Sequence, residues 1–176
     1  MSVDVPLLRL IHESNIIEKI PDILVAERQL IRYMEFLDGP LTKESILGFS
    51  GFIGPEVRLR SEVGMDVAVG RHVAPAGGPL IPIMLASYIR DCNASPRASL
   101  LSLHHRFLFM HPFMDGNGRV SRAILMWMAS RTRSGEDAWI WESMLRRGFL
   151  TTWYYMTLDS MDAETRRAAA ILGDES

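Results

Sequence analysis

The chain has 176 residues, of which 48% are hydrophobic and 23% are charged, so it can bury a sizeable core in one domain spanning residues 1–176. The net charge of −2 argues against a general nucleic-acid-binding protein, and the single cysteine, Cys92, cannot form an internal disulfide. No apolar run is long enough to span a membrane and the N-terminus lacks a secretory signal, so we expect a cytoplasmic protein with no membrane and no nucleic-acid partner.

Hydrophobic residues at helical spacing predict that the N-terminal third of the chain is helical. The helices expected there cover residues 7–20, 23–37 and 42–47. The second helix should end at Gly39 and Pro40, and Thr42 can cap the third. The glycine-rich stretch 48–54 predicts a bend.

The stretch from residue 56 to residue 78 is the least helical part of the chain. Apolar residues alternate with other residues in it, which predicts a strand pair or an extended flap over residues 63–75. The alternating residues are Val63, Met65, Val67 and Val69. The glycine- and proline-rich sequence at 75–79 predicts a loop.

The periodicity of the remaining chain again predicts helices. One helix should start at Ser95 and Pro96 and end near Met110, because Pro112 disfavours helical geometry at the residue before it. The next should begin within residues 116–119. Further helices are expected at 83–92, 139–146 and 150–161, with a polar connection at 131–136. The predicted fold class is therefore mainly α, with one small β element.

Residues 111–122, with the sequence HPFMDGNGRVSR, form a loop that leads into a helix start. Free backbone N–H groups at a helix N-terminus attract anions. Gly116 and Gly118 allow the backbone to approach phosphate oxygens closely. Arg119 and Arg122 are three residues apart, so they share a helix face from which two guanidinium groups can each grip a phosphate.

Two further side chains in this stretch suit catalysis. Asp115 is a hard oxygen ligand that suits Mg²⁺ beside phosphates. His111 can accept a proton near neutral pH. The Asn-Gly pair could instead mark a hairpin, but its flanks have helical periodicity. A lone histidine or a pair of arginines is usually ordinary surface, so the combination of residue types carries the argument.

The stretch resembles the signature of the Fic family (the Fic/Doc domains), His-x-Phe-x-Asp/Glu-Gly-Asn-Gly-Arg-x-x-Arg, at every fixed position. The resemblance implies a Fic-type helical core with a small β-hairpin flap. It also implies transfer of AMP from ATP, with Mg²⁺, to a Ser, Thr or Tyr hydroxyl of a protein target. The Doc branch, which phosphorylates its target, carries Lys at the position of Gly118, so Gly118 favours AMP transfer.

The resemblance implies a role for each residue of the motif. His111 would be the general base on the target hydroxyl, Asp115 would position Mg²⁺, and Asn117 would orient the α-phosphate. The two arginines would bind the β- and γ-phosphates. The nucleotide-binding groups would together be Gly116, Asn117, Gly118, Arg119 and Arg122.

The segment 67–75 is similar to the flap of the family, which holds the modifiable side chain of the target by strand addition. An exposed strand edge offers unpaired backbone groups for that purpose. The docking residues would be Val67, Val69, Gly70 and His72. Without the motif, an ordinary surface hairpin would be the simpler interpretation.

Many Fic proteins carry an inhibitory helix with the pattern Ser/Thr-x-x-x-Glu-Gly/Asn, and the stretch from Ser14 to Glu18 is similar. Lys19 departs from the pattern, which has Gly or Asn at its last position. We expect residues 1–20 to hold the inhibitory helix and Glu18 to lie over the motif and pair with Arg122.

Several alternatives stay open. The stretch from Ser160 to Glu164 has the same spacing and competes as the inhibitory element, and Ser14 and Glu18 could simply lie on the polar side of an amphipathic helix. The enzyme could use another nucleotide donor or remove AMP from a modified target. A module that binds a nucleotide or a partner without turnover is a third function, against which the intact motif argues. A homo-oligomer is also left open.

Overall fold

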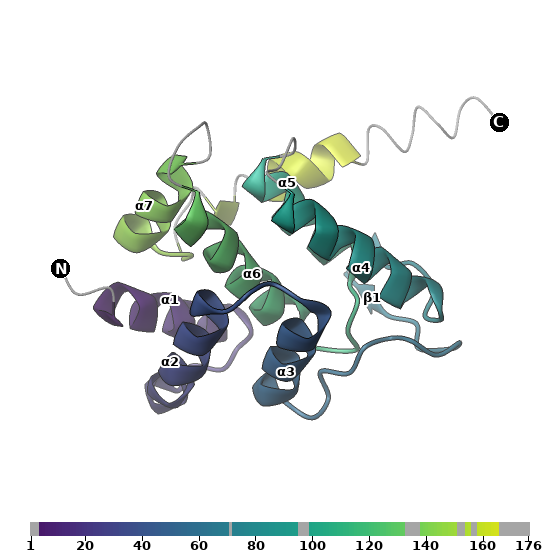
Figure 1. The fold of residues 1–176 in the computed structure, drawn as a ribbon, viewed down its shortest axis with the longest axis horizontal. Coiled ribbons are helices and arrows are strands. Elements are labelled where there is room, and N and C mark those ends of the chain that lie inside the picture. The colour runs from purple at the N-terminus through teal and green to yellow at the C-terminus, as the bar shows by residue number, and fades with distance from the viewer. Residues whose placement is uncertain are drawn as a thin grey trace.

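The structure is a computed structural model that describes residues 4–70, 72–94, 99–132, 138–150, 154–155 and 158–165 (Figure 1). The helices are α1 (Asp4–Ile17), α2 (Ile23–Asp38), α3 (Lys43–Ile53), α4 (Leu80–Asn93), α5 (Leu100–Met110), α6 (Asn117–Arg131) and α7 (Ala138–Arg147). The strands are β1 (Ala68–Val69) and β2 (His72–Val73). The predicted mainly α fold class with a small hairpin is confirmed. Within the described residues, no helix is both long and apolar enough to cross a membrane.

Helix α6 is the centre of the fold and packs against α1, α2, α3, α5 and α7 (Figure 1). Its side chains are buried on every face, since nearly all positions from Asn117 to Ala129 are shielded from solvent. A helix that is buried all round must lie in the interior. The first turn of α6 is the second half of the motif, so the core itself fixes the position of the arginines.

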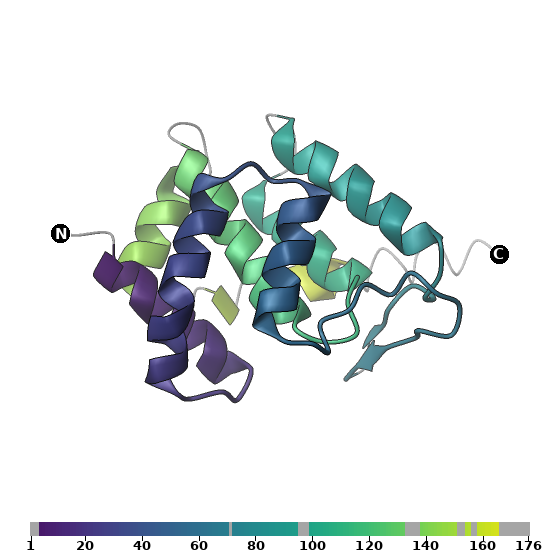
Figure 2. The same ribbon diagram turned by 60° about the horizontal axis from the view of Figure 1, so that its bottom comes forward.

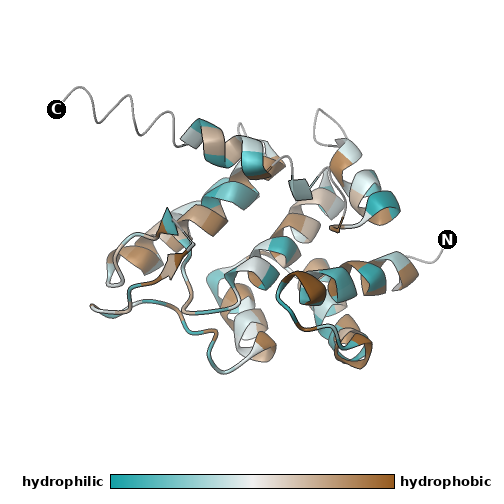
Figure 3. Ribbon diagram, turned by 180° about the vertical axis from the view of Figure 1, so that it is seen from behind, coloured by the Kyte–Doolittle hydropathy of each residue, from teal (hydrophilic) through white to brown (hydrophobic). Residues whose placement is uncertain are grey.

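Helix α1 is part of the same core. Its apolar side chains Leu7, Leu10 and Ile11 are buried, and hydrophilic and hydrophobic residues alternate along it (Figure 3). The guanidinium of Arg9 donates to the carbonyl oxygens of Met144 (3.2 Å) and Leu145 (2.8 Å) near the end of α7. The N-terminal helix is therefore packed and hydrogen-bonded as an integral element of the fold.

The hairpin is shorter than the sequence predicts. Strands β1 and β2 are antiparallel, with Ala68 opposite Val73 and Val69 opposite His72. Gly70 in the turn has a φ of 59°, a value that glycine adopts without steric cost and that two-residue hairpin turns require. Figure 2 shows the hairpin within the long connection between α3 and α4. Of the segment 63–75, for which the sequence predicts a strand pair or an extended flap, only residues 68–69 and 72–73 pair as strands, and residues 62–64 turn.

The predicted bend at 48–54 is also wrong, because α3 continues through both of its glycines to Ile53. Phe49, Ser50 and Ile53 are buried on one face, and this packing outweighs the weak helix propensity of glycine. Nothing lies within 4 Å of a Cβ built at Gly48 or Gly51, so no close contact requires glycine at either position.

Two predicted helices lie partly outside the described residues. Helix α5 is capped by Ser99, whose hydroxyl accepts from the N–H of Ser102 (3.2 Å), whereas the predicted start at Ser95 and Pro96 lies outside the described residues. The predicted helix at 150–161 lies partly outside them, and residues 154–155 and 158–165 are helical.

Candidate active site

The motif joins the end of α5 to the start of α6. His111 is the C-cap of α5 and has a left-handed backbone, with φ 48° and ψ 61°. Gly116 is the N-cap of α6. The twelve residues therefore fold as a loop and a helix start, as the periodicity of their flanks predicts.

Asn117 closes this loop. Its Oδ1 accepts from the backbone N–H of Phe113 (2.9 Å), and its Nδ2 donates to the carbonyl of the same residue (2.8 Å). Phe113 is fully buried and packs against Phe107, with ring centroids 6.3 Å apart. The amide nitrogen of Asn117 carries a second hydrogen that these two bonds do not use.

Gly116 is required by both conformation and space. Its φ is 70°, which disfavours residues with a side chain. A Cβ there would lie 2.8 Å from Cγ2 of Val57, closer than carbon atoms approach without a shift. The backbone at the start of α6 thus lies directly against the core, and its first N–H groups have no partner within the helix.

Arg119 and Asp115 provide a charged pair at this helix start. Arg119 is only 6% exposed, and its Nε has no hydrogen-bond partner among the described residues. Its Nη2 lies 3.7 Å from Oδ2 of Asp115, whose side chain is 57% exposed. A buried donor without a partner is costly, and an anion at the helix start would satisfy it.

Asp115 fits a phosphate-bound Mg²⁺ better than a site made of protein ligands alone. No group of three or more His, Cys, Asp or Glu side chains that could hold a metal occurs in the described part of the chain. Mg²⁺ commonly binds through one or two carboxylates together with substrate phosphates and water. A single exposed carboxylate beside a buried guanidinium suits that arrangement.

Arg122 is buried, and the N-terminal segment supplies several of its partners. Its Nε donates to the hydroxyl of Ser14 (2.8 Å), and its Nη2 donates to the Ser14 carbonyl (3.0 Å). The same Nη2 lies 2.7 Å from Oε1 of Glu18. Burial opposes the charge of Arg122, but Tyr154 and Glu18 raise its pKa above the ordinary value. The ion pair expected from the sequence is therefore present in the structure.

Glu18 follows the last residue of α1, which ends at Ile17 and not at Ile20 as predicted. The N–H of Ile20 bonds to the carbonyl of Asn15 (2.7 Å) and that of Lys19 to the carbonyl of Ile16 (2.8 Å). These two bonds make a Schellman motif. Lys19 has a φ of 62°, the left-handed value that the motif demands and that Gly or Asn adopts readily.

The competing inhibitory element lies elsewhere in the fold. Ser160 and Glu164 are exposed on the helical segment 158–165, whereas the side chain of Glu18 is only 28% exposed. A Cβ built at Gly118 would collide with the carboxylate of Glu18. The glycine at this position thus leaves the space that the Glu18 carboxylate fills.

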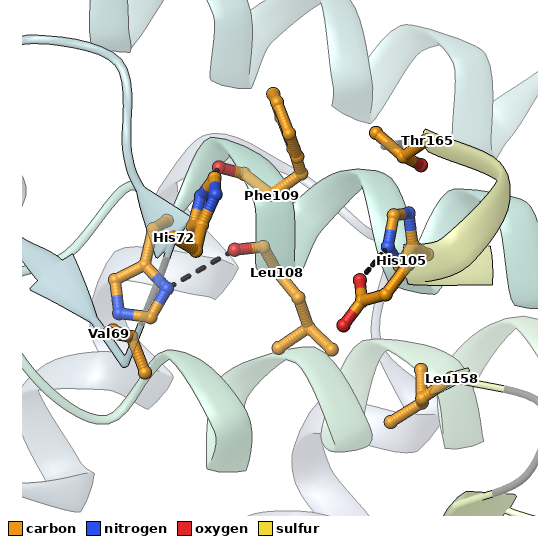
Figure 4. A pocket seen from close by; sticks show the side chains of 9 residues that line it. Val69, His72, His105, Leu108, Phe109, Leu158 and Thr165 are labelled. Atoms are coloured by element: carbon orange, nitrogen blue, oxygen red, sulfur yellow. Dashed lines mark hydrogen bonds and ion pairs between the residues drawn. The ribbon is translucent and has the colours of Figure 1, made fainter. Parts of the chain in front are cut away.

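His111 opens onto a cavity of about 460 Å³ beside the hairpin. In Figure 4, Val69 and His72 lie on one side of this cavity, and Leu158 and Thr165 lie on the other. The other residues that line it are His105, Leu108, Phe109, His111 and Asp162. The cavity therefore connects the predicted general base to the hairpin and to the C-terminal helical segment.

The imidazole of His111 is arranged to accept a proton. Its Nδ1 lies 3.2 Å from the carbonyl oxygen of Leu108, and because a carbonyl only accepts, Nδ1 must carry the hydrogen. The lone pair of the neutral ring is then on Nε2. Burial lowers the pKa of His111 below its ordinary value, and the positive charge of Arg60 adds to this effect.

Two of the four predicted docking residues reach this cavity. Val69 and His72 line it, and Nε2 of His72 lies 2.8 Å from the carbonyl oxygen of Phe109 at the end of α5. Gly70 forms the hairpin turn instead, and the carbonyl of Val67 accepts from the N–H of Ala74 (3.2 Å), which extends the strand pairing.

Two buried residues that support the site were not predicted to take part in it. His104 lies between the carbonyl of Ser121 (3.2 Å from Nδ1) and the hydroxyl of Tyr154 (3.0 Å from Nε2). Burial lowers the pKa of His104 to about 3, so it is neutral and holds the hydroxyl that hydrogen-bonds Arg122. The other is Arg60, which hydrogen-bonds the carbonyl of His111. No local spacing marks either residue, because their partners are distant in the sequence.

Comparison with known proteins assigns the family. A family model described as Fic/DOC family matches residues 3–129. Two curated proteins named Protein adenylyltransferase Fic, from Drosophila persimilis and Drosophila pseudoobscura pseudoobscura, are 35% identical over 66 residues, or 34% of this chain and 13% of theirs. A protein of the same name from Drosophila ananassae is 33% identical over the same shares. The chain thus covers 13% of the length of these relatives. Because the family model matches most of its residues, this chain belongs to the Fic/DOC family.

Proposed function

We propose that this chain is a protein adenylyltransferase that moves AMP from ATP to a Ser, Thr or Tyr hydroxyl of a protein target. The observation that carries the proposal is the arrangement of the motif. A neutral imidazole with a lone pair on Nε2 opens onto a cavity, while the same loop ends in a helix start with two buried guanidinium groups. The adenylyltransferase names of the relatives also support it.

The chemistry divides between the two halves of the motif. Nε2 of His111 accepts the proton of the target hydroxyl as its oxygen attacks the α-phosphorus. Backbone N–H groups from Gly116 to Gly118 and the guanidinium of Arg119 hold the phosphates and stabilise the charge that leaves with pyrophosphate. Asp115 would hold Mg²⁺, which when bound neutralises phosphate charge.

The proposal includes inhibition by the N-terminal segment. Arg122 is the natural partner of the γ-phosphate, but its Nη2 is paired with Glu18 at 2.7 Å. An exposed ion pair contributes only about 0.2–1 kcal/mol, so an exposed glutamate would inhibit only a few-fold. The Arg122 side chain is 3% exposed and that of Glu18 28% exposed, so this pair is shielded enough to inhibit more strongly.

The test is incubation of the chain and of Glu18→Gly with ATP and Mg²⁺, followed by intact-mass measurement. We expect an AMP adduct that increases by well over a few-fold in Glu18→Gly, whereas the matched control Glu164→Gly changes little. Activation by Glu164→Gly alone would place the inhibitory element at the C-terminal segment.

Binding to ATP distinguishes the remaining functions. We expect calorimetry to show ATP binding that weakens with a chelator and after Asp115→Ala. Binding without any adduct in either variant, on any candidate target, would support a non-catalytic module. If an adduct forms only with another nucleotide, that nucleotide is the donor in place of ATP.

A further inference from the structure

Arg60 is a fully buried arginine whose hydrogen bonds all go to backbone carbonyls of two separate regions. Its Nε donates to His111 (2.7 Å) and its Nη2 to Met110 (3.1 Å), both at the junction of α5 and the motif. Its Nη1 donates to Met65 (3.1 Å) and to Pro75 (2.8 Å), which lie before and after the hairpin. One side chain thus connects both ends of the hairpin segment to His111 through hydrogen bonds.

The backbone of Arg60 makes the same connection. Its N–H donates to the carbonyl of Pro112 (2.9 Å), and its carbonyl accepts from the N–H of Gly78 (3.0 Å). The neighbouring Leu59 forms an isolated antiparallel bridge with Phe113. The segment around Arg60 therefore lies between the motif loop and the hairpin and pairs with both.

Only a guanidinium can make this set of contacts. It offers five N–H donors in a fixed planar fork and is more weakly hydrated than an ammonium group, so it is the cation that tolerates burial best. A lysine offers three donors at one point and cannot reach carbonyls on both sides. Burial of the charge is costly, and four hydrogen bonds to carbonyls offset that cost.

The contact with His111 bears on the reaction. The left-handed backbone of His111 is strained for a residue with a side chain, and such a conformation persists where the surroundings fix it. The hydrogen bond from Arg60 to the His111 carbonyl is one of those constraints. A change in it would rotate the residue whose ring carries Nε2.

We infer that Arg60 is a positioning residue that sets the distance between the hairpin and the His111 imidazole, so that a peptide added to the hairpin edge presents its hydroxyl to Nε2. The role in transfer rests on the proposed function. The mechanical link between the hairpin and the motif does not, because it can be measured without activity.

The first experiment is hydrogen exchange on the full chain with Arg60→Lys, with Arg58→Lys as the matched control. Arg58 lies two residues away with an exposed side chain. We expect the peptide covering residues 63–78 to exchange at least about tenfold faster in Arg60→Lys, while peptides from α6 keep their protection. Equal exchange of the hairpin in the two variants would overturn the inference.

The second experiment separates positioning from folding. In the Glu18→Gly background, Arg60→Lys should slow automodification at saturating ATP and Mg²⁺ by at least about tenfold, since a misplacement of about 1 Å can cost about 10²-fold. ATP affinity should stay unchanged, because the phosphate-binding groups lie on α6. A parallel loss of ATP affinity and rate would mean that Arg60 only supports the fold.

Guanidinium rescue covers the case in which a substitution unfolds the chain. Arg60→Ala leaves a cavity of guanidinium shape, so guanidinium ion at a concentration too low to denature should restore part of the hairpin protection and of the rate. Arg58→Ala should not respond. No rescue in a folded Arg60→Ala would contradict the role of the carbonyl contacts. If the Glu18→Gly parent forms no adduct, the proposed function fails, and hydrogen exchange alone then decides the inference.

Discussion

His111 takes its properties from its surroundings. The carbonyl of Leu108 fixes its tautomer, the hydrogen bond from Arg60 fixes its backbone, and burial lowers its pKa. An imidazole ordinarily has a pKa of about 6.5. Because its folded-state pKa is lower, His111 is neutral and able to accept a proton throughout the neutral range.

The pH dependence of transfer should reflect this lowered pKa. Protonation of His111 removes the lone pair on Nε2, so the rate falls as the pH decreases through the pKa of this residue. We expect the acid limb of kcat/KM for automodification by Glu18→Gly to lie below pH of about 6.5. A limb at or above that pH would contradict the assignment.

His111→Ala should lose about 10²–10⁴-fold in rate with ATP binding retained.

Gly118 is a position where one substitution should have opposite effects in two backgrounds. A Cβ there would collide with the carboxylate of Glu18, so Gly118→Ala should destabilise the parent chain by about 1–3 kcal/mol. In Glu18→Gly the carboxylate is gone, and the remaining close atom, Nη1 of Arg122 at 3.0 Å from the Cβ position, is the end of a flexible side chain. Alanine should then stabilise the first turn of α6 by up to about 1 kcal/mol. Urea unfolding of the four proteins measures both signs. The same sign in both backgrounds would show that Glu18 does not occupy this space.

At the scale of elements, the end of α1 explains the one departure from the inhibitory pattern. Lys19 occupies the left-handed position of the Schellman motif, where the family pattern has Gly or Asn. The two backbone bonds hold Glu18 just before it, in line with Arg122. The last position of the pattern therefore reflects how the helix ends, whereas its Ser and Glu positions reflect contacts.

A substitution at Lys19 tests this interpretation. Lys19→Asn should raise the stability of the chain by about 1 kcal/mol, because asparagine visits the left-handed region at lower cost. In a chain of this length that corresponds to roughly 2–4 °C in Tm. Lys19→Ala removes the same side chain but keeps the backbone strain, so it should give no gain. Equal Tm changes in the two variants would refute the explanation.

The helices were predictable because their periodicity is local, and the errors occurred where packing decides. Glycines at 48 and 51 suggested a bend, but the buried face of α3 carries the helix past them. The motif was predictable because its chemistry is contained in twelve consecutive residues. Arg60 was not predictable, because two arginines stand two residues apart and nothing in the sequence shows that Arg58 is exposed while Arg60 is buried. The carbonyl partners of Arg60 also belong to distant segments.

At the scale of the whole molecule, the N-terminal helix that leads to Glu18 cannot leave the fold as a unit. Helix α1 contacts α2, α6 and α7, and Arg9 bonds to the last turn of α7. Glu13 accepts from the backbone N–H of Phe149 just beyond that helix. If Glu18 inhibits as proposed, relief must therefore come from the turn that carries Glu18, with α1 still in place.

Removal of the N-terminal segment and removal of the Glu18 carboxylate should thus have different outcomes. Full burial of Leu7, Leu10 and Ile11 contributes about 1.5–3 kcal/mol for each side chain, and their sum is comparable to the roughly 5–15 kcal/mol by which a native domain is stable. Deletion of residues 1–20 should therefore abolish cooperative thermal unfolding by circular dichroism and all transfer with it. Glu18→Gly should keep a cooperative transition and gain activity. A deletion variant that is folded and more active than the parent would show instead that α1 is a removable cover.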